Sequence, residues 1–108
     1  MMRIPDDSFI SSPKVTHYLL VHRQRNDKSK FLAKGGFTAT NPAALEQEIR
    51  RATANNDASV DRTNEHGVYY RIDAELFGVN DVALPVALIW LQRESDGSFH
   101  FVTLKPRK

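Results

Sequence analysis

The residues best suited to chemistry lie in a hairpin near the C-terminal end of the sequence. Residues 86–91 read V-A-L-I-W-L, and Asp96-Gly97 separates this run from a second one at 98–105. Asp-Gly between two strand-like runs is a strong hairpin signal. Side chains alternate along a strand, so a two-residue loop places aromatic, amide, hydroxyl and amine groups on one face: Trp90, Gln92, Phe101, Thr103 and Lys105. Such a face can stack a base and hold a phosphate.

The same two-residue loop predicts which residues of the hairpin stand opposite one another: Leu91 and Val102, Ile89 and Leu104, Trp90 and Thr103. The other face of the hairpin is purely apolar and must be covered. We therefore expect one buried core that contains Leu45, Ile49, Ile89, Leu91, Val102 and Leu104. A competing interpretation of the mixed face is an aromatic cluster packed under lysine stems.

Metal-free cleavage of RNA is chemistry that these residue types can perform. The 2′-hydroxyl of the substrate is the nucleophile, so the protein supplies only a proton acceptor, a proton donor and cations for the phosphate. Lys, Arg, His, Thr and Tyr side chains suffice for these roles. The composition therefore permits a ribonuclease without requiring one.

A metal site is not indicated by the four histidines, His17, His22, His66 and His100. The first two stand about 140° apart around a helix, and no carboxylate has a spacing that completes a site. The sequence has no cysteine, no Gly-rich phosphate loop and no nucleophile elbow. We therefore expect neither a metal nor another cofactor.

Three helices are expected in the first half of the chain. Ser-Pro and Asn-Pro pairs, which combine a capping residue with a proline suited to the first helical turn, predict helices over 13–22 and 42–54. Asp27 predicts the cap of a shorter helix over 28–34, which Gly35-Gly36 ends.

From residue 58 onward the hydrophobic period changes from that of a helix to that of a strand. Residues 68–77 alternate apolar and polar side chains, with Tyr69 and Arg71 on the polar side, and 59–63 can pair with this strand. Helices followed by four antiparallel strands predict an α+β fold, with N-terminal helices packed on one face of a four-stranded antiparallel sheet. The opposite face then adds Tyr69 and Arg71 to the mixed face of the hairpin.

Length and composition predict one domain over residues 1–108. The N-terminal residues lack the apolar core of a signal peptide, and no apolar run is long enough to span a membrane. Together with the absence of cysteine, this predicts a cytoplasmic protein without membrane contact. The net charge is +2, with basic residues concentrated at 23–34 and 105–108. This weakly indicates an anionic partner, and the alternative is ordinary solvated lysines.

Several motifs resemble a known family: I-P at 4–5, K-V-T-H-Y-L-L at 14–20, K-S-K-F-L-A-K-G-G-F at 28–37, G-V-Y-Y at 67–70, and I-W-L at 89–91 followed by F-V-T-L-K-P at 101–106. Over nearly the whole chain they resemble a family of small bacterial domains of unknown function, which stand alone or are associated with toxins. The order of helices and strands is similar to the ribonuclease toxin superfold that includes barnase, the colicin tRNases and the RelE toxins.

The resemblance implies a set of site residues. Lys14 and Lys28 match lysines of the family pattern, and Trp90 and Thr103 match its final hairpin. The chain departs from the family where Val21-His22 replaces the usual Asn-Pro, and its histidines do not match family positions.

Two functions are therefore expected. In the first, the protein is a toxin-like, metal-independent ribonuclease that cleaves RNA by 2′-hydroxyl attack. Lys14 and Lys28 hold the phosphate, Thr103 hydrogen-bonds to it, and the substrate-binding residues are Trp90, Tyr69, Arg71 and Lys105. A co-encoded antitoxin or immunity-like protein is then the expected partner. In the second, the chain is a non-enzymatic binding module that recognises a partner protein or RNA through its exposed sheet face.

Overall fold

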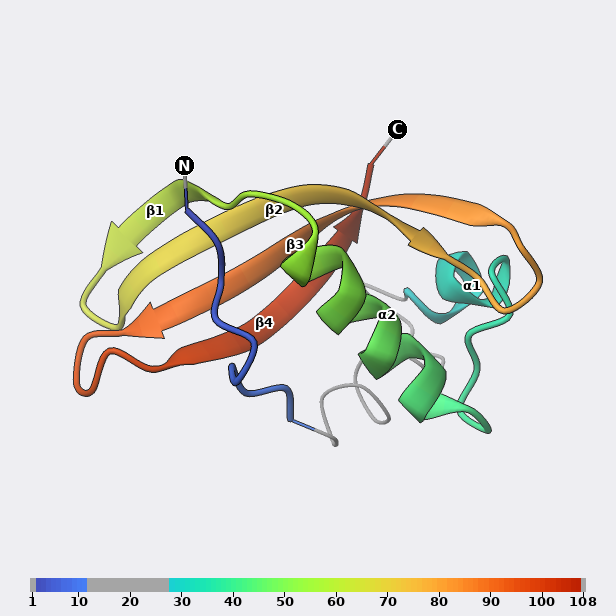
Figure 1. Ribbon diagram of the computed structural model, residues 1–108, viewed down its shortest axis with the longest axis horizontal. Helices are drawn as coiled ribbons and strands as arrows, with labels where there is room; N and C mark the ends of the chain where they lie inside the picture. The colour runs from blue at the N-terminus through green and yellow to red at the C-terminus, as the bar shows by residue number, and fades with distance from the viewer. Residues whose placement is uncertain (1, 12–27, 108) are drawn as a thin grey trace.

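The computed structural model describes residues 2–11 and 28–107. The helix predicted over 13–22 lies outside these residues. In chain order the described elements are helices α1 (Ser29–Ala33) and α2 (Pro42–Ala54), and strands β1 (Ser59–Asn64), β2 (Gly67–Phe77), β3 (Ala83–Arg93) and β4 (Phe99–Pro106). The strands form one antiparallel sheet in the order β1-β2-β3-β4. Helix α2 lies across one face of it (Figure 1). The predicted α+β class and four-stranded antiparallel sheet are confirmed.

Helix α2 begins at the predicted proline and buries the side of the helix that carries Leu45 and Ile49. Spacing of four residues places these two side chains on one stripe, which faces the sheet. Asn41 precedes the helix, but its side chain makes no capping bond within it. Its carboxamide instead accepts from the Thr38 backbone N–H at 2.8 Å and donates to the Gly36 carbonyl at 3.0 Å. The asparagine therefore fixes the loop that enters α2.

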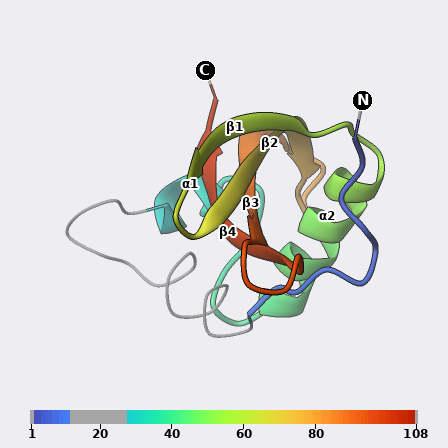
Figure 2. The same ribbon diagram turned by 90° about the vertical axis from the view of Figure 1, so that its left-hand side faces the viewer.

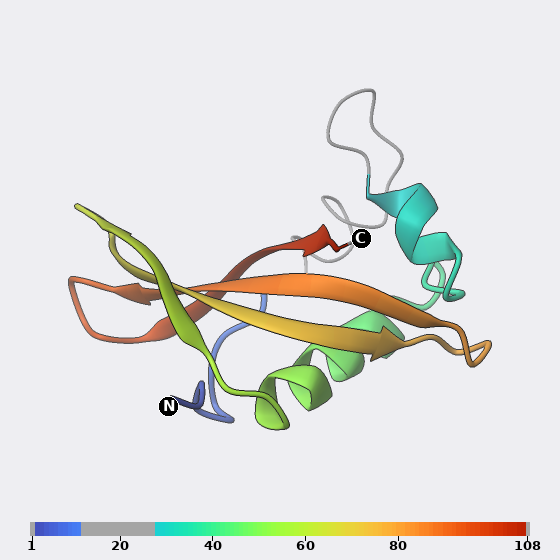
Figure 3. The same ribbon diagram turned by 90° about the horizontal axis from the view of Figure 1, so that it is seen from above.

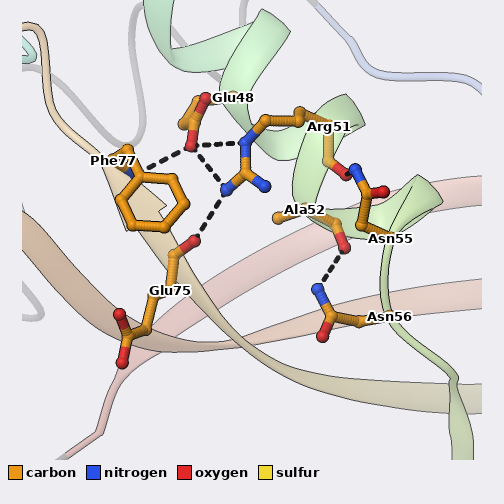
Figure 4. A network of polar contacts seen from close by, with 7 residues as sticks. All are labelled: Glu48, Arg51, Ala52, Asn55, Asn56, Glu75 and Phe77. Carbon is orange, nitrogen blue, oxygen red and sulfur yellow. Dashed lines mark hydrogen bonds and ion pairs between the residues drawn. The ribbon is translucent and has the colours of Figure 1, made fainter.

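Two side chains of α2 bind the edge of β2 where β1 no longer covers it. Strand β1 pairs with β2 only as far as Arg71. Beyond that point Arg51 donates to the Glu75 carbonyl at 2.9 Å, and the Glu48 carboxylate accepts from the Phe77 backbone N–H at 2.7 Å (Figure 4). Open strand edges leave backbone groups without partners, so these bonds both satisfy the edge and orient α2 against the sheet.

Residues 2–11 cross the sheet on the same side as α2 (Figure 1). Met2 forms a bridge with Ala58 at one side of the sheet, and Phe9 forms one with His100 on β4 at the other. Ile4 between them is almost fully buried. This segment therefore covers a part of the same sheet face that α2 does not reach.

Helix α1 lies at one end of the sheet, on the other side from α2 (Figures 2 and 3). Its Leu32 still reaches the core. The Gly35 carbonyl accepts from the Val79 N–H at 2.8 Å, and a Cβ on Gly78 would lie 2.2 Å from that carbonyl oxygen. Only glycine permits this backbone contact. It pins α1 to the β2–β3 turn and leaves the first residues of the helix beside the sheet face opposite α2.

Strand β2 follows the predicted alternation. Ile72, Ala74 and Leu76 are buried, whereas Arg71, Asp73 and Glu75 are exposed. In contrast, the predicted pairing of β3 with β4 is wrong. The loop between them has five residues, 94–98, and Gln92 pairs with Phe99. A β-bulge then shifts the register, so Trp90 pairs with Phe101 and Ile89 with Thr103.

The pairing of β3 with β2 inverts the expected faces of β3, because Leu88 stands opposite the buried Ile72 and Trp90 opposite Tyr70. Leu88 and Trp90 face α2 and join the core with Phe101 and Leu104. The predicted core was right for Leu45, Ile49 and Leu104, and wrong for three others: Ile89, which is buried but outside the core cluster, and Leu91 and Val102, which are half-buried. All residues from 86 to 91 are apolar. Both faces of this stretch are therefore equally suited to burial, and the sequence could not show which one faces the core.

Candidate functional site

The candidate site lies on the sheet face opposite α2, called the outer face below. Cross-strand pairing aligns Arg71, Ile89 and Thr103 in one row across β2, β3 and β4. The next row aligns Asp73, Ala87 and Lys105. Neighbouring strands are about 4.8 Å apart, so the two rows form a small surface with basic and hydroxyl side chains around a buried apolar centre.

Lys28 reaches this surface from the start of α1. It is the last residue before the helix, and its Nζ donates to the Thr103 Oγ1 at 2.7 Å. Both side chains are half-buried. Burial, followed by the nearby ammonium group of Lys105, lowers the pKa of Lys28 below its ordinary value. The structure therefore brings together three of the expected site residues, Lys28, Thr103 and Lys105. Lys14 lies outside the described residues.

Trp90 does not belong to the outer face. Its side chain is 1% exposed and packs edge to face against Phe101, with ring centroids 5.5 Å apart. The expectation that it faces Thr103 and stacks a base is wrong: Trp90 lies on the core side of the sheet opposite Tyr70, and the bulge on β4 turns Thr103 to the other face. The ring lies in the core, and its indole N–H has no hydrogen-bond partner among the described residues.

Tyr69 and Arg71 lie on the outer face as predicted, but each already has a partner. The guanidinium carbon of Arg62 lies 4.4 Å from the centre of the Tyr69 ring, which is mostly buried. Arg71 Nε donates to the Asp73 carboxylate at 2.8 Å, and this hydrogen bond raises the pKa of Arg71. A ligand must displace these partners before it can use either side chain.

A second polar cluster lies in the β3–β4 loop, and no function was predicted for it. The Ser98 hydroxyl donates to the Asp96 carboxylate at 2.6 Å and lies 2.8 Å from His100 Nε2. The His100 ring stacks on Phe9 at 4.9 Å between centroids. The Ser98 hydroxyl and backbone N–H lower the pKa of Asp96. An Asx turn of this kind could be read from the sequence Asp-Gly-Ser; it shapes the loop.

Within residues 2–11 and 28–107, no three His, Asp or Glu side chains gather where they could hold a metal ion. Neither α1 nor α2 is long and apolar enough to cross a membrane.

The fold and site thus define a small α+β domain with a basic, hydroxyl-bearing sheet face. Residues 5–108 match the family model described as domain of unknown function DUF6883, so the chain belongs to that family. The family expected from the sequence motifs, a domain of unknown function, is confirmed at this level. No curated protein matches the chain.

A solved structure shares the fold. It is titled "Contact-dependent growth inhibition toxin - immunity protein complex from Klebsiella pneumoniae 342". The similarity has a TM-score of 0.66 at 18% sequence identity, and it covers 94% of this chain and 95% of the other. At this level of sequence identity the similarity establishes the fold alone, so any chemistry has to be argued from the residues of the site. The narrower expectation of a ribonuclease superfold stays a prediction.

Proposed function

We propose that the protein is a toxin-like, metal-independent ribonuclease whose outer face holds a phosphate of RNA. The observation that carries the proposal is the contact between Lys28 and Thr103, with Lys105 close enough to lower the pKa of Lys28. Two amines and a hydroxyl on the same small surface can neutralise and hydrogen-bond a phosphate. Lys14 is the further lysine expected there. The fold shared with a chain from a toxin–immunity complex also supports a toxin-like function.

The site suits cleavage by the substrate's own hydroxyl group. The RNA 2′-oxygen attacks phosphorus, the bond from phosphorus to the 5′-oxygen breaks, and the products are a 2′,3′-cyclic phosphate and a 5′-hydroxyl. The 2′ proton passes to solvent, and the ammonium group of Lys28 protonates the leaving oxygen. A lysine with a lowered pKa is a better proton donor than an ordinary lysine. Lys105 and Thr103 stabilise the charge that develops on the phosphate.

Recognition in this proposal depends on the backbone of RNA more than on its bases. Trp90 is buried, and Tyr69 and Arg71 are held by Arg62 and Asp73. An RNA strand that displaces Arg62 gains the face of Tyr69 for stacking. A co-encoded antitoxin or immunity-like protein, acting in the cytoplasm, is the partner that such an activity requires.

The experiment is cleavage of single-stranded RNA by purified protein in EDTA. Lys28→Ala should lower the rate by at least ~10²-fold, the low end for a group that stabilises charge in the transition state. Lys30→Ala is the matched control, because Lys30 lies exposed on the same helix. RNA with 2′-O-methyl groups should stay intact. Cleavage that survives Lys28→Ala, or that needs a divalent cation, contradicts the proposal.

The second candidate is a non-enzymatic module that binds RNA or a partner protein through the outer face. The burial of Trp90 favours it, since the outer face then loses one of the two aromatic side chains expected to stack a base in the nuclease. Filter binding separates the two functions. RNA that is retained intact by wild-type protein, and lost with Lys28→Ala and Lys105→Ala, identifies a binding module; RNA that is cut identifies the nuclease.

A further inference from the structure

The contact between Thr103 and Lys28 has the geometry of an activated hydroxyl nucleophile. Such nucleophiles need a base within about 2.6–3.2 Å of the hydroxyl oxygen, and Lys28 Nζ lies 2.7 Å from Thr103 Oγ1. The other bond of this hydroxyl, to the Leu104 carbonyl, is weak at 3.3 Å. An amine in its neutral form therefore has the Thr103 proton within reach.

The surroundings of Lys28 favour that neutral form. Burial and the neighbouring Lys105 both lower its pKa. Among the described residues, the same rows of the outer face also carry Arg71 and Asp73 on β2, which are paired with each other, and α1 carries Lys30. A lysine that is partly desolvated and next to a second cation can act as a base at moderate pH.

A β-bulge orients Thr103 toward this amine. Phe101 is buried in the core, and in a regular strand residue 103 would point to the same side as residue 101. The register shift between Ile89 and Trp90 leaves Val102 as the extra residue, which turns Thr103 to the outer face. Bulges often re-aim a side chain beside a functional site. Neither the packing of Phe101 nor that of Leu104 needs the hydroxyl on the outer face.

From this geometry we propose that Thr103 and Lys28 form a nucleophile–base dyad that accepts an acyl group from an anionic carboxylic ester. Lys28 takes the hydroxyl proton, the Thr103 oxygen forms a bond to the carbonyl carbon, and the bond from that carbon to the leaving oxygen breaks. The Lys28 ammonium then protonates the leaving alkoxide. Water, deprotonated by Lys28, hydrolyses the acyl-threonine in the same way. The Lys105 ammonium attracts the anionic substrate and stabilises the oxyanion.

This activity goes beyond RNA cleavage, in which the nucleophile belongs to the substrate and Thr103 only binds phosphate. The test is covalent labelling of the folded protein with an alkyl fluorophosphonate, in which the threonine oxygen displaces fluoride from phosphorus. Intact mass and peptide fragmentation should place one label on Thr103. Thr103→Ser should keep the label and Thr103→Val should lose it. Ser98→Ala is the matched control, since Ser98 lies on the same proteolytic peptide.

The base is tested through Lys28 and its neighbour. Lys28→Arg keeps the charge but cannot lose a proton at ordinary pH, so labelling should slow by at least ~10²-fold, the low end for a general base. In the wild type, labelling should rise with pH to a midpoint below the ordinary lysine pKa, and Lys105→Ala should move this midpoint upward. A merely structural role for Lys105 would leave the midpoint in place.

Four results would overturn the dyad: no label on the wild type, a label on Lys28 or Ser98, full labelling of Lys28→Arg, or an unlabelled Thr103→Ser that is folded by circular dichroism. The ribonuclease assay is scored separately, so loss of one activity is distinguishable from loss of the other.

Discussion

Separate truncation of two leucines in β3 tests which face of the strand packs in the core. Leu88 is fully buried and Leu91 is only half-buried on the opposite face, although they are three positions apart in one strand. Leu→Ala removes three carbon groups, each worth about 0.8 kcal/mol when buried. The transfer term for Leu88→Ala is therefore about 2.4 kcal/mol. A cavity among Leu104, Trp90 and α2 adds to it, so the expected loss is about 2–5 kcal/mol.

Leu91→Ala should cost much less. Its side chain already contacts water in the folded state, so it loses about half the transfer term, on the order of 1 kcal/mol, and leaves no closed cavity. Urea unfolding at equilibrium, followed by tryptophan fluorescence of the buried Trp90, measures both changes in stability. The slope of the unfolding free energy against urea concentration should be the same for both variants. If Leu91→Ala were as costly as Leu88→Ala, the register of β3 and the assignment of its faces would be wrong.

Two further predictions concern the hairpin loops. Gly67→Ala should destabilise the fold more than Gly97→Ala: both residues have positive φ, but a Cβ on Gly67 would lie 2.0 Å from the Gln92 carbonyl oxygen, whereas one on Gly97 meets nothing closer than 4.0 Å; urea midpoints measure the difference. Ser98→Ala should raise the pKa of Asp96 toward its ordinary value in an NMR titration, because the Ser98 hydroxyl is the largest cause of the lowering. Since the folded-state pKa is lowered, the carboxylate stabilises the fold above the ordinary Asp pKa, and this stabilisation disappears as the pH falls through the folded value. A pKa of Asp96 that does not move would show that the backbone N–H of Ser98 is sufficient.

The sequence alone determined the elements that depend on local signals. The Asn-Pro pair set the start of α2 at Pro42, and polar residues on alternate positions of β2 fixed which side of that strand carries Tyr69 and Arg71. The proline is suited to the first helical turn, and on β2 the charged residues are acceptable on one side only, because a charged side chain cannot be buried without a partner. The family motifs also identified Lys28 and Thr103 as residues to consider together.

Only the tertiary structure decided which side of the final hairpin faces the core and which residues meet at the site. Either face of β3 is apolar enough to be buried, so local alternation could not choose between Ile89 and Trp90 for the core. The pairing of β3 with β2 made that choice, because it places Leu88 and Trp90 on the same side of the sheet as the buried Ile72. The bulge at Val102 then lets Phe101 pack against Trp90 while Thr103 turns outward. The approach of Lys28 to Thr103 joins residues 75 positions apart; it depends on how α1 is pinned at the end of the sheet, which no local pattern in the sequence specifies.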